Sequence, residues 1–128
     1  MHYDASILLV DDYEFIRTIL ERMLQQLGYQ NLRMAADGVD ALHLLRIRPV
    51  DLVITDYHMP EMDGIGLFQS IQQDPALAKI PVLLISGVPT EKFVIQALAI
   101  GIQSTLNQPF RAEQLDQEIQ SLLTRSLS

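Results

Sequence analysis

Short apolar runs alternate along this chain with longer segments in which apolar residues recur at helical spacing. Uninterrupted runs of this length are typical of strands that are buried on both faces of a sheet. The five runs cover residues 6–10, 32–36, 51–55, 80–86 and 102–106. The second is weaker than the others, and the fifth has a mixed character that indicates less burial.

A segment with helical periodicity follows each run. In the first, apolar residues recur at three- and four-residue steps from Ile16 to Leu27, and Gly28 is well suited to end the helix. The other expected helices include residues 41–45, 65–71, 91–100 and 115–123. Alternating strands and helices predict an α/β fold, in which helices cover both faces of a parallel sheet through right-handed crossovers. We expect one domain over residues 1–128, with a core of about 5–124.

The residues at the strand ends are the candidates for function, because open parallel sheets bind ligands outside the carboxyl ends of their strands. They are Asp11 and Asp12 after the first run, Asp56 after the third, Ser86 and Gly87 at the fourth, and Gln108 near the fifth. Three carboxylates, a hydroxyl and an amide are thus expected at one rim of the sheet. Because like charges repel, one carboxyl group should have a raised pKa unless a cation intervenes.

A hard divalent cation, Mg²⁺ or Mn²⁺, fits a set of oxygen ligands without histidine or cysteine. A zinc site through His58 is disfavoured because no second histidine stands at ligand spacing. A structural role remains an alternative for two of these residues, since Asp12 could cap the following helix and Ser86 could be a turn residue. Asp56 has no comparable local role after four apolar strand residues.

Composition excludes several classes of function. The 128 residues include no cysteine, which rules out disulfides and thiolate metal sites. A net charge of −7 argues against direct binding to nucleic acid. No apolar run approaches the roughly 20 residues of a membrane span, and residues 1–4 are too polar for a signal peptide. We therefore expect a cytoplasmic protein without membrane contact.

The sequence resembles the receiver domain of two-component response regulators over nearly its whole length. The matching segments are ILLVDD (7–12), DLVITDYHMPEMDG (51–64), IPVLLISG (80–87) and QPF (108–110), with weaker support from ADGVDAL (36–42). The resemblance implies a flavodoxin-like (βα)5 fold, a five-stranded parallel sheet of order 2-1-3-4-5 flanked by five helices. It thereby adds a strand order that alternation alone does not give.

The resemblance also implies a role for each strand-end residue. Asp56 would accept a phosphoryl group from a phosphohistidine on a sensor histidine kinase or phosphotransfer protein. Asp12, Asp56 and the backbone carbonyl of His58 would bind Mg²⁺, and Asp11 would act mostly through a metal-bound water. The hydroxyl of Ser86 would contact the phosphoryl group and move on activation. Such a protein phosphorylates and dephosphorylates itself as a switch and is not a turnover enzyme.

Two residues depart from the family's pattern. Members usually carry lysine at the place of Gln108 and an aromatic residue at the place of Thr105. The lysine pairs with the phosphoryl group, and the aromatic ring turns inward as the hydroxyl of the fourth strand moves. We therefore expect phosphorylation to persist while its link to conformational change weakens.

Three hypotheses remain open. The first is a stand-alone, Mg²⁺-dependent phosphoacceptor switch. The second is a pseudo-receiver, an interaction module that no longer depends on phosphorylation. The third, a phosphohydrolase with an aspartate nucleophile, is disfavoured because such enzymes typically place a second aspartate where this chain has His58.

The fourth helix is apolar around most of its circumference. The residues that can face the sheet are Val94, Ala97 and Leu98, whereas Phe93, Ile95 and Ala99 cannot all do so. The exposed remainder predicts a surface for a partner or a homodimer, unless Phe93 folds under the preceding loop. The resemblance implies the same face, made by helix 4, strand 5 and helix 5, for contact with a downstream protein.

Overall fold

The computed structural model describes residues 2–59, 61–87, 91–102 and 104–127. Its strands are β1 (Ile7–Val10), β2 (Leu32–Ala35), β3 (Leu52–Asp56), β4 (Val82–Ser86) and β5 (Ser104–Asn107). Its helices are α1 (Glu14–Leu27), α2 (Gly38–Ile47), α3 (Gly64–Gln73), α4 (Glu91–Ala99) and α5 (Ala112–Leu127). Strands and helices alternate throughout, as the hydrophobic pattern predicts.

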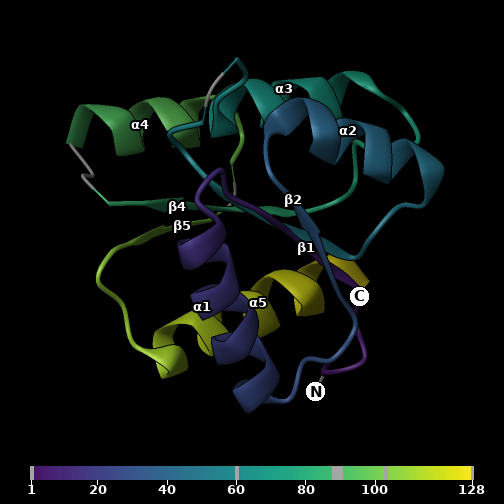
Figure 1. Cartoon of the computed structure of the whole chain (residues 1–128). Helices are drawn as coiled ribbons and strands as arrows, with labels where there is room; N and C mark the ends of the chain where they lie inside the picture. The colour runs from purple at the N-terminus through teal and green to yellow at the C-terminus, as the bar shows by residue number, and fades with distance from the viewer. Residues whose placement is uncertain (1, 60, 88–90, 103, 128) are drawn as a thin grey trace.

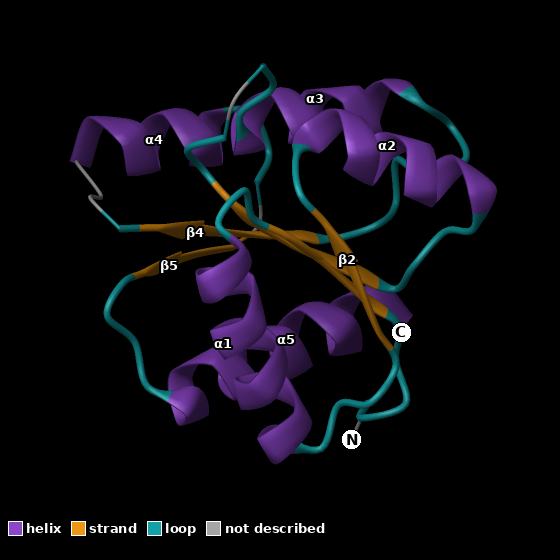
Figure 2. Ribbon diagram, viewed as in Figure 1, coloured by secondary structure: helices purple, strands orange, loops and turns teal. Residues whose placement is uncertain are grey.

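All strand pairs are parallel, and the strand order is β2-β1-β3-β4-β5. Helices α2, α3 and α4 cover one face of the sheet, and α1 and α5 cover the other (Figures 1 and 2). The predicted fold class and strand order are therefore confirmed. Because all strands run the same way, their carboxyl ends meet at one rim.

Two apolar layers fill the space between the sheet and its helices. Side chains of successive strand residues point to opposite faces, so each central strand contributes to both layers. Leu8 and Val53 belong to the layer under α2, α3 and α4, whereas Leu9 and Ile54 belong to the layer above α1 and α5. These four are at most 1% exposed, and burying each such side chain is worth roughly 1.5–3 kcal/mol. This double burial explains why the strands read as continuous apolar runs.

Strand β5 begins two residues later than predicted, at Ser104. Gly101, at a φ of 101°, donates its backbone N–H to the carbonyl of Leu98, and Ile102 donates to Ala97. Ile102 is therefore buried as part of the turn that closes α4, and its apolar side chain was wrongly assigned to the strand.

The orientation of α4 agrees only in part with the prediction. Ala97 is fully buried, as expected, but Leu98 is 55% exposed and does not face the sheet. The two residues are neighbours on the helix and point about 100° apart, so burial of one turns the other outward. Ile95 is also exposed. The predictions for Phe93 and Val94 concern side chains outside the described part of the structure.

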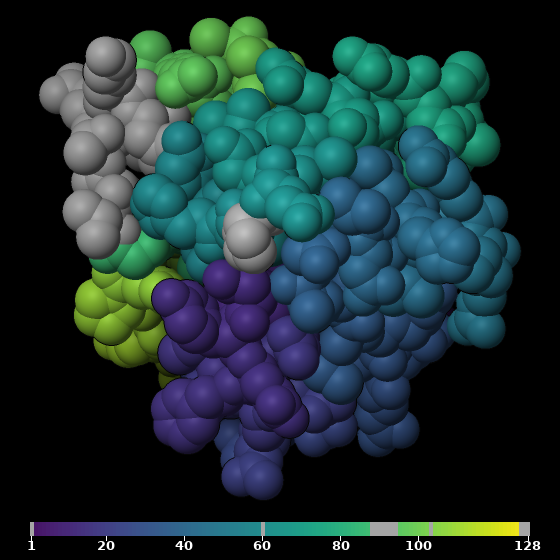
Figure 3. Space-filling model, turned by 45° about the horizontal axis from the view of Figure 1, so that its top comes forward, coloured from purple at the N-terminus to yellow at the C-terminus, as the bar shows by residue number. Residues whose placement is uncertain are grey.

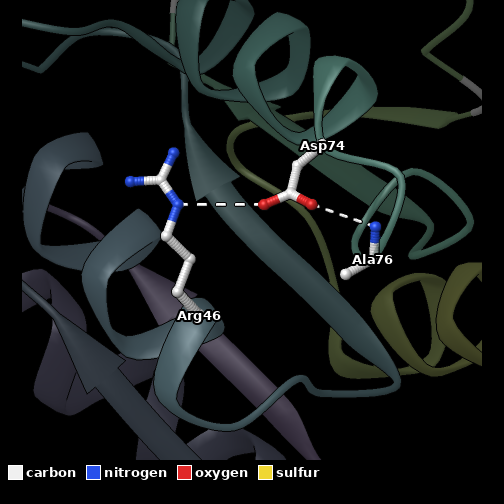
Figure 4. A network of polar contacts seen from close by, with 3 residues as sticks. All are labelled: Arg46, Asp74 and Ala76. Atoms are coloured by element: carbon white, nitrogen blue, oxygen red, sulfur yellow. Dashed lines mark hydrogen bonds and ion pairs between the residues drawn. The ribbon is translucent and has the colours of Figure 1, made fainter.

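An ion pair joins the end of α2 to the turn after α3 (Figure 4). The Nε atom of Arg46 lies 3.8 Å from a carboxylate oxygen of Asp74, whose other oxygen accepts the backbone N–H of Ala76 at 2.9 Å. The Arg46 side chain is 61% exposed, and exposed pairs contribute only about 0–1 kcal/mol. Asp74 acts here mainly by ordering the turn.

Candidate metal centre

Three carboxylates converge where β1 and β3 end, and we call Asp11, Asp12 and Asp56 together the acidic rim. One carboxylate oxygen from each lies within 4.8 Å of the other two. Ser86 ends the neighbouring strand β4, where its predecessor Ile85 pairs with Asp56. In the space-filling view, the purple segment that leads into α1, the blue α2 segment and the teal segment after β3 form one continuous surface (Figure 3). The predicted convergence of the three carboxylates is confirmed.

The backbone around Asp11 fixes the first carboxylate. One of its oxygens accepts the N–H of Tyr13 at 2.8 Å, and its own carbonyl accepts from the Arg17 guanidinium at 2.6 Å. Its side chain is buried. Tyr13, not Asp12, is the N-cap residue of α1, and its side chain makes no capping bond. The structural alternative for Asp12 is therefore wrong.

Two buried polar atoms at this site have no hydrogen-bond partner within the described residues. They are Oδ1 of Asp12 and Oγ of Ser86. Leaving a buried polar atom unpaired costs about 1–3 kcal/mol, and native proteins contain few such atoms. One belongs to the acidic rim and the other ends the neighbouring strand, and together they indicate a site that binds a further group.

Burial is the main cause of the raised carboxyl pKa values. It raises the pKa of Asp11 to about 6, and the charges of Asp56 and Asp12 add to this, although the Tyr13 N–H opposes it. Burial also raises the pKa of Asp56, again with a contribution from Asp12. The predicted repulsion among the carboxylates is thus present, but desolvation exceeds it.

The loop from β3 to α3 holds the third carboxylate. Oδ1 of Asp56 accepts the N–H of Tyr57 at 2.9 Å, and the Tyr57 carbonyl accepts the N–H of Gly64 at 2.9 Å. A Cβ at position 64 would lie 2.5 Å from the Leu84 side chain and 2.6 Å from the Asp56 carbonyl, so only glycine fits there. The side chain of His58 is exposed, and its ring packs edge-on against Tyr57.

Gln108 lies beside the end of β4. Its backbone N–H donates to the Ser86 carbonyl at 2.9 Å, and its Oε1 lies 3.2 Å from where a Cβ on Gly87 would stand. A larger residue than glycine at position 87 would therefore press on this amide. Thr105 is half-buried on β5 and pairs with Leu84, two residues short of the strand ends.

Two contributors to the site escaped the sequence-based prediction. Tyr13 acts through its backbone N–H, which no side-chain pattern reveals. Thr55 is fully buried directly before Asp56, and its only signal was a hydroxyl at the end of an otherwise apolar run.

The donor set fits a hard divalent cation. Among the described residues, the cluster that could hold a metal ion consists of carboxylates alone. Oxygen ligands of this kind suit Mg²⁺ or Mn²⁺ rather than zinc. The unpaired Oδ1 of Asp12 is the atom that such an ion would satisfy.

A flavodoxin-like sheet with an acidic cluster at its carboxyl ends defines the structural class of this protein. The sequence pattern of the response regulator receiver domain matches residues 7–120. The chain belongs to this family, the receiver domains of two-component signalling.

Relatives match this sequence over almost their full length. Chemotaxis protein CheY-3 of Vibrio cholerae is 34% identical over 125 residues, which are 98% of this chain and 96% of that protein. Chemotaxis protein CheY of Pseudomonas aeruginosa is 34% identical over 120 residues, 94% of this chain and 97% of the relative.

Solved structures of receiver domains and response regulators have the same fold as this chain. The signal receiver domain of an HD domain-containing protein from Pseudomonas fluorescens Pf-5 has a TM-score of 0.86 at 35% identity, covering 96% of this chain and 97% of the other. A response regulator of Chloroflexus aurantiacus, described there as putative, gives 0.88 at 27% identity, with 94% and 98% covered. Within the described residues, no helix is both long and apolar enough to span a membrane.

The raised pKa of Asp11 predicts how stability changes with pH in the absence of metal. The folded-state pKa of about 6 exceeds the ordinary value of 3.8, so the folded protein binds the proton more tightly. The resulting stabilisation is complete below about pH 4 and is lost as the pH rises through 6. At pH 8 with EDTA, we expect the free energy of unfolding of Asp11→Asn to exceed that of wild type by roughly 1–2 kcal/mol, because the variant buries no charge. At pH 4 we expect little difference between the two.

Urea unfolding at both pH values measures this, with Asp4→Asn as a control for the loss of one exposed negative charge. Equal stability of Asp11→Asn and wild type at pH 8 would contradict the pKa assignment.

Proposed function

We propose that this chain is a phosphoacceptor switch of a two-component system. Asp56 accepts a phosphoryl group from a phosphohistidine of a sensor histidine kinase or phosphotransfer protein, in a reaction that requires Mg²⁺. The observation that carries the proposal is that two buried oxygens, Asp12 Oδ1 in the acidic rim and Ser86 Oγ at the end of the neighbouring strand, have no hydrogen-bond partner within the described residues. One would face a metal ion and the other a phosphoryl oxygen.

In this mechanism Asp12, Asp56 and the backbone carbonyl of His58 would hold the metal, and Asp11 would act through a water molecule bound to it. A bound Mg²⁺ supplies the positive charge that lets an anionic carboxylate approach an anionic phosphoryl group. Asp12, Tyr57 and His58 also line an open groove beside the acidic rim.

The chain's own residues perform the transfer. The Asp56 carboxylate attacks phosphorus in line; a carboxyl oxygen–phosphorus bond forms, and the phosphorus–nitrogen bond breaks to release imidazole. The N–H of Tyr57 orients the carboxylate through Oδ1, and the Ser86 hydroxyl donates to a phosphoryl oxygen. Water later hydrolyses the acyl phosphate and restores Asp56. Each chain accepts one phosphoryl group per cycle, so the protein is a switch rather than a turnover enzyme.

Gln108 weakens one interaction of the phosphorylated state. A hydrogen bond from a charged donor is worth about 1.5–3 kcal/mol, and a neutral one about 0.5–1.5 kcal/mol. An amide in place of an ammonium therefore forfeits on the order of 1–2 kcal/mol, a factor of roughly 5 to 30. With Thr105 in place of an aromatic ring, phosphorylation and conformational change are less tightly coupled. Output passes to a downstream protein or a second copy through α4, β5 and α5, where Ile95 and Leu98 are exposed.

The pseudo-receiver is the second candidate, and Gln108 and Thr105 are the residues that favour it. An interaction module that has lost phosphotransfer has no need for three clustered carboxylates and an unpaired serine hydroxyl, which oppose this candidate. Phosphohydrolase activity is disfavoured because the side chain two residues after Asp56 is a histidine.

Mass spectrometry of the intact protein separates these candidates. After incubation with Mg²⁺ and acetyl phosphate, we expect one added phosphoryl group, absent from Asp56→Asn and from samples with EDTA. The matched control is Asp51→Asn, an aspartate at the opposite end of β3, which should retain the adduct. No adduct on wild type would support the pseudo-receiver, and rapid consumption of the donor without an adduct would support a hydrolase.

The missing ammonium also makes a prediction about metal affinity. Without a resident positive charge the acidic rim attracts Mg²⁺ more strongly, so we expect wild type to bind Mg²⁺ more tightly than Gln108→Lys. Isothermal titration calorimetry measures both affinities. Gln26→Lys adds the same charge at the far end of α1 and should match wild type. Equal or tighter binding by Gln108→Lys would be inconsistent with this electrostatic role.

A further inference from the structure

Thr55 is a buried polar residue to which the mechanism above gives no role. It directly precedes Asp56 on β3, and its side chain is 0% exposed. A buried hydroxyl among apolar neighbours is costly unless it makes a hydrogen bond. Its partner therefore indicates why the strand carries threonine rather than valine at this position.

The hydroxyl of Thr55 donates to the backbone carbonyl of Asp56, with the two oxygens 3.0 Å apart. The sulfur of Met59 lies 3.9 Å from the hydroxyl and is a weaker acceptor. The last pair of the β1–β3 ladder is Val10 with Thr55, so Asp56 lies one residue beyond it. The Asp56 carbonyl therefore lies past the end of this ladder, and the Thr55 hydroxyl is a donor to it there.

That carbonyl belongs to the same rigid peptide unit as the Tyr57 N–H, since the peptide bond is planar. The Tyr57 N–H in turn bonds to Oδ1 of Asp56 at 2.9 Å and to the Ile85 carbonyl at 3.0 Å. Thr55 thus holds one end of a peptide plane whose other end holds the reactive carboxylate. Gly64 packs directly on the same carbonyl, which leaves the plane little room to tilt.

We infer that Thr55 is a positioning residue for the acceptor site. Its hydroxyl fixes the Asp56–Tyr57 peptide plane and thereby the direction of the Asp56 carboxylate and the start of the loop that carries His58. This inference rests on the proposed role of Asp56 in binding Mg²⁺ and accepting phosphate.

Two substitutions at position 55 separate the hydroxyl from the packing of the side chain. Thr55→Val keeps the shape and removes the hydroxyl, whereas Thr55→Ser keeps the hydroxyl and removes a methyl group. Loss of one hydrogen bond predicts that Thr55→Val binds Mg²⁺ about threefold to tenfold more weakly than wild type in calorimetry. We expect a similar fall in its initial rate of phosphorylation by acetyl phosphate, and we expect Thr55→Ser to stay within about twofold of wild type.

Ser104→Ala is the control for loss of a buried hydroxyl as such. Ser104 begins β5, away from the acidic rim, and donates to the carboxylate of Glu118. The Ser104→Ala substitution should lower the free energy of unfolding in urea but leave the Mg²⁺ affinity unchanged. Urea unfolding of both Thr55 variants checks that each is folded under the binding conditions. If Thr55→Val is not folded, Thr55→Ser can still be compared with wild type.

The outcomes distinguish the role of Thr55 from the proposed function of Asp56. Suppose that wild type binds Mg²⁺. The inference is then overturned, and the proposed function left intact, if Thr55→Val has the same Mg²⁺ affinity as wild type or if Thr55→Ser has the lower affinity of the two variants. Wild type that neither binds Mg²⁺ nor gains a phosphoryl group overturns the proposed function and the inference together.

Discussion

The site depends on one electrostatic constraint, the crowding of three carboxylates, one buried and two half-buried, at a single rim of a parallel sheet. Desolvation and mutual repulsion both oppose their charge, as the raised pKa values of Asp11 and Asp56 show. Folding nevertheless places them together, because the parallel strands of the core align their ends and the core stabilises that arrangement. A divalent cation would offset this cost, so binding of such an ion would stabilise the folded protein.

Backbone groups, more than side chains, give the rim its geometry. The N–H of Tyr13 holds Asp11, the N–H of Tyr57 holds Asp56, and the Ser86 carbonyl receives the N–H of Gln108. Within the described residues, Oδ1 of Asp12 and Oγ of Ser86 remain without a hydrogen-bond partner. The main-chain hydrogen bonds make the site sensitive to whatever fixes the peptide planes, which is the reason a residue such as Thr55 matters.

Much of the fold was predictable because strands buried on both faces must be continuously apolar, and carboxylates that directly follow such strands must lie at one rim. Strand order was not predictable from alternation and came from the family resemblance. Ile102 was wrongly predicted to lie in the fifth strand, because a turn that closes a helix can bury an apolar residue just as a strand does. Leu98 was wrongly predicted to face the sheet, because the sequence of a helix that is apolar on most sides does not indicate which side is buried. The role of Thr55 depends on where the β1–β3 ladder stops, which no sequence pattern specifies.

We expect the acidic rim to bind a divalent cation in the folded protein. The free energy of unfolding at pH 7, measured by urea titration over a series of Mg²⁺ concentrations, tests this expectation most directly. We expect the free energy of unfolding to rise by about 1.4 kcal/mol for each tenfold increase in Mg²⁺ concentration above the dissociation constant, and we expect Asp12→Asn to abolish this rise. A stability that does not change with Mg²⁺, or that rises equally in Asp12→Asn, would contradict it.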